Sequence, residues 1–126
     1  MSYRSLDIYK ISFDLFVRTH PASLKLPKYE LYELGSQVRR SSDSVVSNIS
    51  EGYGRSYYKK EYERFLVFSH SSCDETLGHL EKIIILYPHL KMDFEPLQIE
   101  YNLLGGKINN YLKWVRLNWN DIKNNP

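Results

Sequence analysis

Residues 37–55 read Gln-Val-Arg-Arg-Ser-Ser-Asp-Ser-Val-Val-Ser-Asn-Ile-Ser-Glu-Gly-Tyr-Gly-Arg, and this stretch decides the predicted fold. Apolar and small residues recur in it at the spacing of an amphipathic helix, which predicts about five helical turns. The Gly-x-Gly at residues 52–54 favours the end of that helix. Its predicted core-facing seam, written as a heptad, consists of Leu31, Leu34, Val38, Ser41, Val45 and Asn48, with Ile49 beside it.

A stripe of polar residues runs beside this seam, close enough to the core to be half buried. An unpaired polar group in such a position costs on the order of 1–3 kcal/mol, so the stripe needs partners from another helix, another subunit or a ligand. It could be a ligand or nucleic-acid site, or a hydrogen-bonded network that fixes helix register and subunit packing. The predicted network consists of Gln37, Arg40, Ser44, Asn48, Glu51 and Arg55, met by Glu75 from the following helix.

A family resemblance rests on the same residues. The pattern is Gln-x-x-Arg-x-x-x-Ser-x-x-x-Asn-Ile-x-Glu-Gly-x-Gly-Arg, carried here by Gln37, Arg40, Ser44, Asn48, Ile49, Glu51, Gly52, Gly54 and Arg55. It resembles the signature of four-helix-bundle proteins encoded in intervening sequences of bacterial large-subunit ribosomal RNA genes. The chain is also similar to the accessory protein of diversity-generating retroelements. The resemblance, over roughly residues 6–90, implies a bundle that assembles as a ring, typically a homopentamer, and favours the network interpretation of the stripe.

The periodicity predicts four helices and no strand. Pro21 disfavours a helical residue before it and so ends the first helix, whereas Pro96 is tolerated in the first turn of the fourth. The predicted spans run from a Ser5 cap to His20, from Leu31 to Glu51, from a Ser56 cap to Pro88, and from about Asp93 to residue 117. The expected architecture is therefore an all-α, antiparallel up-down-up-down four-helix bundle over residues 1–117, followed by a polar C-terminal tail over residues 118–126.

Each helix has a predicted apolar face. These faces are Leu6, Tyr9, Phe13, Phe16 and Val17 in the first helix; Tyr58, Tyr62, Phe65, Leu66, Ser69, Cys73, Thr76, Leu80, Ile83 and Tyr87 in the third; and Leu97, Tyr101, Leu104, Ile108, Tyr111 and Val115 in the fourth. Gly105 and Gly106 weaken the middle of the fourth helix by about 1 kcal/mol each, which indicates a close helix contact there.

Composition sets the broad class of protein. A chain of 126 residues predicts one domain, and its net charge of +2 gives no argument for nucleic-acid binding from the total alone. The single cysteine, Cys73, excludes an internal disulfide and fits a reducing cytoplasm. The longest strongly apolar run, residues 83–87, is far shorter than the ~20 residues of a membrane span. We therefore expect a cytoplasmic protein with no membrane association.

A basic and aromatic cluster follows the second helix. Residues 55–60 read Arg-Ser-Tyr-Tyr-Lys-Lys. Lysine and arginine can neutralise phosphates and tyrosines can stack on unpaired bases, so this cluster is a predicted nucleic-acid site. In the alternative interpretation the tyrosines pack between helices or subunits and the lysines are solvated, while Glu61 and Glu63 dilute the positive field. The predicted nucleic-acid-binding residues are Arg39, Arg40, Arg55, Lys59, Lys60 and Arg64.

Catalytic and metal sites have weaker signals. Arg64 and His70 resemble the Arg-x(4–6)-His motif of the all-helical HEPN ribonucleases, in which the histidine acts as acid or base and the arginine stabilises the phosphorane. Six residues of helix nevertheless separate two side chains by about 240°. The chain contains no Glu-x-x-His, which di-iron bundles require, and Cys73 is more typical of a small apolar filler than of a ligand. We expect no metal and no cofactor.

These observations lead to three hypotheses of function. The first is a non-catalytic, homo-oligomeric bundle that binds nucleic acid, RNA or DNA, through the basic and aromatic cluster, with RNA favoured by the resemblance. The second is a scaffold for another protein, for example a polymerase, without any role for nucleic acid. The third is a metal-independent ribonuclease of the HEPN kind.

Overall fold

The computed structural model describes residues 2–124, and the side chains of residues 2–119. Four α-helices make up most of the chain: α1 (Asp7–Ser23), α2 (Leu34–Gly54), α3 (Lys59–Leu86) and α4 (Lys91–Asn124). Three short 3-10 helices precede or connect them: η1 (Tyr3–Ser5), η2 (Lys28–Glu30) and η3 (Pro88–Leu90). The described residues contain no β-strand, so the predicted all-α class with four helices is confirmed.

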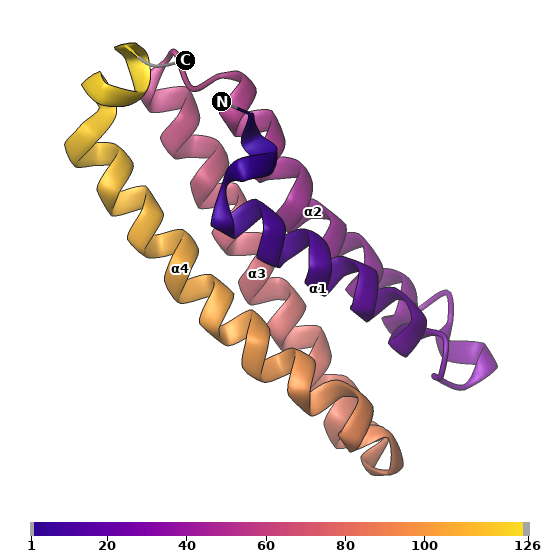
Figure 1. The fold of residues 1–126 in the computed structure, drawn as a ribbon. Coiled ribbons are helices and arrows are strands. Elements are labelled where there is room, and N and C mark those ends of the chain that lie inside the picture. Colours follow the sequence, from indigo (N-terminus) through magenta and orange to yellow (C-terminus); the bar gives the residue numbers. More distant parts are fainter. Residues whose placement is uncertain (1, 125–126) are drawn as a thin grey trace.

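The four helices lie side by side along a common axis (Figure 1). α1 packs on α2, α2 on α3, α3 on α4, and α4 closes the bundle against α1. Within the described residues α1 makes no such contact with α3, nor α2 with α4, so the cross-section is a square with α1–α2 on one side and α3–α4 on the other. These contacts are compatible with the predicted antiparallel, up-down order.

The core confirms most of the predicted seams. Val38, Val45 and Ile49 of α2 are fully buried, and so are the apolar residues expected along α3 and α4, with Tyr62 and Tyr101 the largest among them. At the ends the prediction differs, because Tyr58 is exposed and Tyr87 and Tyr111 are only half buried. No helix among the described residues has both the length and the apolar character needed to cross a bilayer.

The predicted core face of the first helix is wrong at Phe13 and Val17, although Leu6 and Tyr9 are partly buried against the core. Phe13 and Val17 are 47% and 50% exposed, whereas the buried side of α1 is made of Ile8, Ser12, Leu15, Thr19 and Ala22. The buried side of α1 is therefore rotated about the helix axis from the predicted side. Thr19 explains this rotation, because its hydroxyl lies 2.8 Å from the Tyr101 hydroxyl and donates to the Leu15 carbonyl at 2.6 Å. Small hydroxyl residues can thus face the core when their hydrogen bonds are satisfied locally, and the apolar residues they displace are left at the surface.

Several helix boundaries also differ from prediction. α1 continues through Pro21 to Ser23, because Ala22 and Ser23 are buried and Pro21 itself is exposed, where a missing backbone donor costs little. Ser56 is buried and does not cap α3, which begins after Tyr58. α4 begins at Lys91 and leaves helical geometry at Asn118, where the polar tail was expected, but continues as helix to Asn124.

The second helix begins and ends three residues later than its sequence predicts. α2 begins three residues later than expected, at Leu34, and runs to Gly54, with no glycine in the left-handed region. Gly52 is not a helix stop: a Cβ built there would lie 2.7 Å from the Cβ of Phe65, so the glycine permits close approach of α2 and α3. A Cβ at Gly105 would lie 3.7 Å from the Cys73 sulfur, an ordinary contact, whereas Gly106 and Gly54 face open space.

We predict that Gly52→Ala lowers the free energy of unfolding by about 1–3 kcal/mol, since the added methyl forces α2 and α3 apart. Chemical denaturation followed by circular dichroism measures it. Gly54→Ala is the matched control, two residues further along α2 with nothing within 4 Å of the added Cβ. This control should leave stability unchanged or raise it by up to about 1 kcal/mol. Equal effects at the two positions would contradict the close approach.

Candidate nucleic-acid interface

The middle of the polar stripe is a hydrogen-bonded network between α2 and α3. The Ser44 and Ser72 hydroxyls lie 2.8 Å apart across the two helices, and Asn48 Nδ2 donates to the Ser44 carbonyl at 2.8 Å and to its hydroxyl at 3.0 Å. One turn deeper, Thr76 donates to the Ser41 hydroxyl at 2.8 Å. These bonds favour the network interpretation for Ser44 and Asn48, because the serine and threonine bonds join the two helices and Asn48 bonds Ser44 from within α2.

The ends of the stripe are exposed. Arg55 lies 3.7 Å from Glu51 and 3.6 Å from Glu61, in ion pairs whose members are all solvent-accessible. Gln37, Arg40 and Glu75 are exposed and form no side-chain hydrogen bond or ion pair with a described residue. The structure therefore brings together only part of the predicted network, and Glu75 does not join it.

The turn between α2 and α3 presents aromatic rings beside unpaired lysines. Tyr57 and Tyr58 are 55% and 65% exposed, with ring centroids 5.6 Å apart in an edge-to-face arrangement. Lys59 and Lys60 begin α3 and form no ion pair with a described residue. One turn later, the Arg64 guanidinium lies over the Phe68 ring, 5.3 Å from its centroid. We call Tyr57, Tyr58, Lys59, Lys60 and Arg64 the turn patch.

The six basic residues predicted to bind nucleic acid fall into two separate groups. Arg39 and Arg40 precede Arg55 by 16 and 15 residues of continuous helix, which places them about 22–24 Å away along α2. Arg39 is also engaged: its guanidinium donates to the Ser23 hydroxyl at 2.9 Å and to the Leu31 carbonyl at 2.6 Å. Arg39 holds the α1–α2 connection against α2, whereas Arg40 is exposed and forms no ion pair with a described residue.

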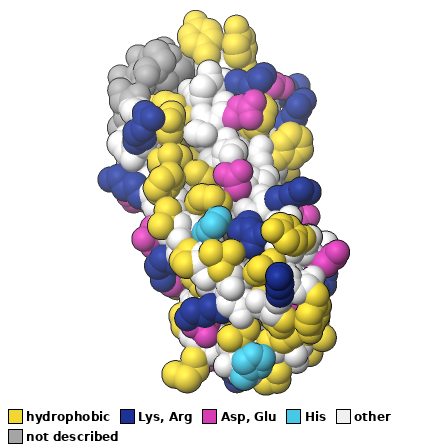
Figure 2. Space-filling model, turned by 90° about the vertical axis from the view of Figure 1, so that its right-hand side faces the viewer, with side chains coloured by type: hydrophobic (Ala, Val, Ile, Leu, Met, Phe, Trp, Pro, Cys, Tyr) yellow, Lys and Arg dark blue, Asp and Glu magenta, His cyan; other side chains and the backbone are white. Residues whose placement is uncertain are grey.

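The surface charge is mixed. On the side formed by α1 and α2, dark-blue lysines and arginines alternate with hydrophobic and acidic side chains and do not form a continuous basic stripe (Figure 2). At the turn patch, Glu61 lies 3.6 Å from both Arg55 and Arg64 and offsets part of their charge. Among the described residues, the cations at the turn that form no ion pair are thus Lys59 and Lys60.

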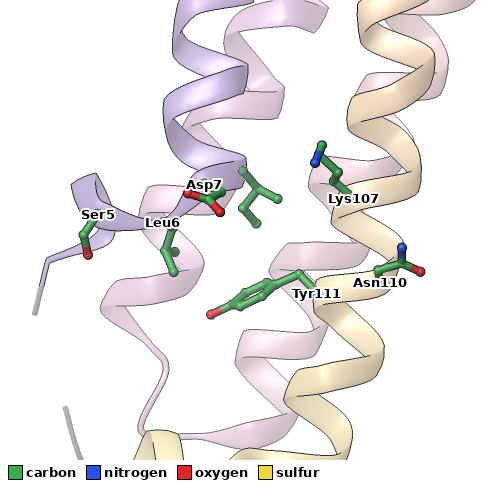
Figure 3. A pocket seen from close by; sticks show the side chains of 7 residues that line it. Ser5, Leu6, Asp7, Lys107, Asn110 and Tyr111 are labelled. Atoms are coloured by element: carbon green, nitrogen blue, oxygen red, sulfur yellow. The ribbon is translucent and has the colours of Figure 1, made fainter.

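The grooves of the bundle are shallow and lined by few chemically reactive groups. One, of about 480 Å³, lies between the start of α1 and α4, with Asp7 on one wall and Lys107 and Asn110 on the other (Figure 3). The Tyr111 ring projects into it, and its hydroxyl lies 2.7 Å from that of Tyr62. Among the described residues, no three His, Cys, Asp or Glu side chains gather as they would around a metal ion.

The ribonuclease-like pair does not converge within one chain. Arg64 lies over the Phe65 and Phe68 rings, and Phe65 packs against Gly52 of α2. His70 points toward α4, where its Nε2 would lie 3.9 Å from a Cβ at Gly105, and its Nδ1 lies 3.5 Å from Asp74. The two side chains therefore cannot meet one phosphate on the same protomer.

Cys73 lies at the centre of the bundle. Its thiol donates to the Tyr101 carbonyl at 3.2 Å and is fully buried. Burial raises the pKa of Cys73 to about 12, so the thiolate needed for nucleophilic or metal chemistry is absent at neutral pH. This placement agrees with the apolar-filler interpretation.

His79 is a buried polar residue that the sequence pattern does not single out. It lies on α3, is 8% exposed, and its Nδ1 has no hydrogen-bond partner within the described part of the chain. Burial, with the nearby charge of Lys82, lowers the pKa of His79 below its ordinary value of 6.5, against the opposing effect of Glu75. One turn away on the same side of α3 lie the buried Thr76 and Ile83, but also the exposed Glu75 and Lys82, so the sequence pattern does not predict the burial of His79.

We predict that His79 makes the bundle acid-sensitive. Because the unfolded chain binds this proton more readily than the folded one, the free energy of unfolding should fall as the pH drops below 6.5. Denaturation at about pH 7.5 and about pH 5.5 measures this loss, which His79→Leu should reduce. His89→Gln, at an exposed position, is the control and should keep the wild-type dependence. An identical pH dependence in His79→Leu and wild type would contradict the assignment.

Comparison with known proteins bears on the same residues. The sequence model of the 23S rRNA-intervening sequence protein family matches residues 4–110. The match includes α1, α2, α3 and the turn patch, and extends into α4. No curated protein matches the chain.

Proposed function

This chain belongs to the 23S rRNA-intervening sequence protein family, and on that premise we propose that it is a non-catalytic RNA-binding protein that assembles with copies of itself. The observation that carries the proposal is the turn patch, where two exposed tyrosines adjoin two lysines that form no ion pair with a described residue. Exposed rings offer stacking surfaces for unpaired bases, and free lysines offer charge to phosphates. The family name associates these proteins with ribosomal RNA, which favours RNA over DNA.

Single-stranded RNA fits the turn patch better than a duplex does. A base can stack on Tyr57 or Tyr58 only if it is unpaired, and the patch projects from a short connection between two helices, with no long groove that could follow a duplex. Two free lysines give a modest affinity. Several copies on one particle would raise it through effective concentration, which makes self-assembly part of the same proposal.

The protein scaffold remains the second candidate. It is favoured by exposed apolar side chains on α1 and α4, which RNA has no reason to cover. The ribonuclease is a weaker alternative, because Arg64 and His70 lie on different sides of α3. Cleavage of metal-free RNA by the wild-type protein, abolished in His70→Ala, would revive it.

We predict that Lys59→Ala with Lys60→Ala weakens RNA binding similarly for all sequences. Each lost phosphate contact should make the dependence of log Kd on log salt shallower by about 0.7, hence about 1.4 for both. Fluorescence anisotropy with a labelled, unstructured RNA, titrated at several salt concentrations on nuclease-treated protein, measures affinity and slope together.

The matched control removes two exposed lysines at the opposite end of the bundle, Lys28 and Lys82. This control changes the net charge equally, so it should alter the affinity only slightly and leave the slope in place. Tyr57→Ala should weaken binding without changing the slope, because stacking releases no counterions. Equal losses in both lysine variants would indicate a diffuse charge effect, and unchanged binding in all three would count against the turn patch.

A further inference from the structure

Two arginines beside the free lysines of the turn share one carboxylate. Arg55 directly follows the end of α2 and Arg64 lies in the second turn of α3, and Glu61 lies 3.6 Å from each of them. Glu61 thus pairs with two cations that come from different parts of the α2–α3 corner. The four basic residues of this region, among which Glu61 lies in the sequence, are Arg55, Lys59, Lys60 and Arg64.

The other two carboxylates near the turn are arranged differently. Glu63 is directed toward α4, where the Arg116 Nε donates to it at 3.0 Å. Glu51 lies 3.7 Å from Arg55. Within the described residues, Glu61 is therefore the carboxylate that pairs with both Arg55 and Arg64.

Both guanidinium groups also lie near the same aromatic ring. The guanidinium carbons of Arg55 and Arg64 are 5.0 and 5.8 Å from the centroid of the Phe65 ring. Phe65 is buried and packs on Gly52 of α2, so the packing of the two helices fixes the position of this ring. The cation–π contacts therefore keep both arginines at the turn even when they are not paired with Glu61.

The pairs with Glu61 are weak enough to be exchanged. The side chains of Arg55, Arg64 and Glu61 are 51%, 59% and 37% exposed, and ion pairs in such contact with water contribute little. Both contacts, at 3.6 Å, are longer than the about 2.7–2.9 Å of a charge-assisted hydrogen bond. A phosphate can replace Glu61 on either guanidinium, because it accepts two parallel N–H bonds from an arginine.

We propose that Glu61 competes with RNA phosphates for Arg55 and Arg64 and so limits the affinity of the turn for RNA. This inference rests on the RNA binding proposed above and names the residue that regulates its strength. In the free protein Glu61 occupies both guanidiniums. A phosphate that takes its place leaves the carboxylate without that partner and close to a second negative charge. The affinity therefore depends mainly on Lys59, Lys60 and the exposed tyrosines.

The test removes the negative charge of Glu61 and keeps its size. Glu61→Gln should tighten binding of the labelled, unstructured RNA by about 3- to 10-fold at low salt, because both arginines become available to phosphates. The dependence of log Kd on log salt should become steeper by up to about 1.4, from about 0.7 for each arginine. Fluorescence anisotropy on nuclease-treated protein measures both quantities.

Glu81→Gln is the matched control. It makes the same change of charge at an exposed position of α3, about 30 Å along the helix from Glu61. Glu81 forms no ion pair with a described residue. This control should change the affinity and the salt dependence only slightly.

A double-mutant cycle separates the release of the arginines from a general gain of positive charge. The charge of Glu61 also acts on the nearby lysines, and that effect does not require the arginines. When Arg55→Gln and Arg64→Gln are already present, Glu61→Gln should therefore give little further gain. A second cycle with Arg64→Gln alone should lose about half of the gain in log Kd. Far-UV circular dichroism with thermal unfolding verifies the fold of each variant.

The outcomes separate this inference from the proposed RNA binding. No binding by the wild type or by Glu61→Gln, even at low salt, would overturn both. Binding by the wild type, with equal affinities in Glu61→Gln and Glu81→Gln, would overturn the competition by Glu61 alone. A gain that persists in full without the two arginines would also overturn it, because Glu61 would then act through its electric field and not by pairing with them.

Discussion

Small residues keep α2 and α3 close along most of their shared length. Gly52 lies against Phe65 with no room for a side chain, and the Ser44–Ser72 and Ser41–Thr76 pairs join the helices further along. The Ser69 hydroxyl even donates to the Val45 carbonyl of the facing helix at 2.8 Å. Such bonds satisfy polar groups that would otherwise be buried at a cost. This pair of helices forms the rigid side of the bundle on which α1 and α4 are placed.

The family signature acquires a physical meaning in this arrangement. Ile49, Ser44 and Gly52 hold α2 to α3 through burial, a hydrogen bond to Ser72 and close approach, and Asn48 bonds Ser44 within α2. Gln37, Arg40 and Glu51 instead lie at the surface, and Arg55 joins ion pairs at the turn. The motif therefore contains two kinds of residue: those that pack between α2 and α3, and those that lie on the surface of this helix pair.

Periodicity was sufficient to predict four helices and the core faces of three. It failed for α1 because large apolar residues were weighted above Ser12 and Thr19, whose hydroxyl bonds make them suitable core residues. Pro21 and Gly52 favour helix ends in the sequence, but the burial of Ala22 and the contact of Gly52 with Phe65 extend α1 and α2 past them. Within the candidate site, the turn patch was predicted from local sequence, whereas the separation of Arg39 from it depends on the length of α2.

The single thiol of Cys73 allows opening of the bundle core to be measured. The chain has one thiol, held between α3 and α4 by its bond to the Tyr101 carbonyl and shielded on every side. A reagent can reach it only when those helices separate, so the rate of its modification counts openings of the core and ignores motion at the surface. Core opening can thus be followed without an added label. Any partner that holds α3 and α4 together should lower the rate of Cys73 modification.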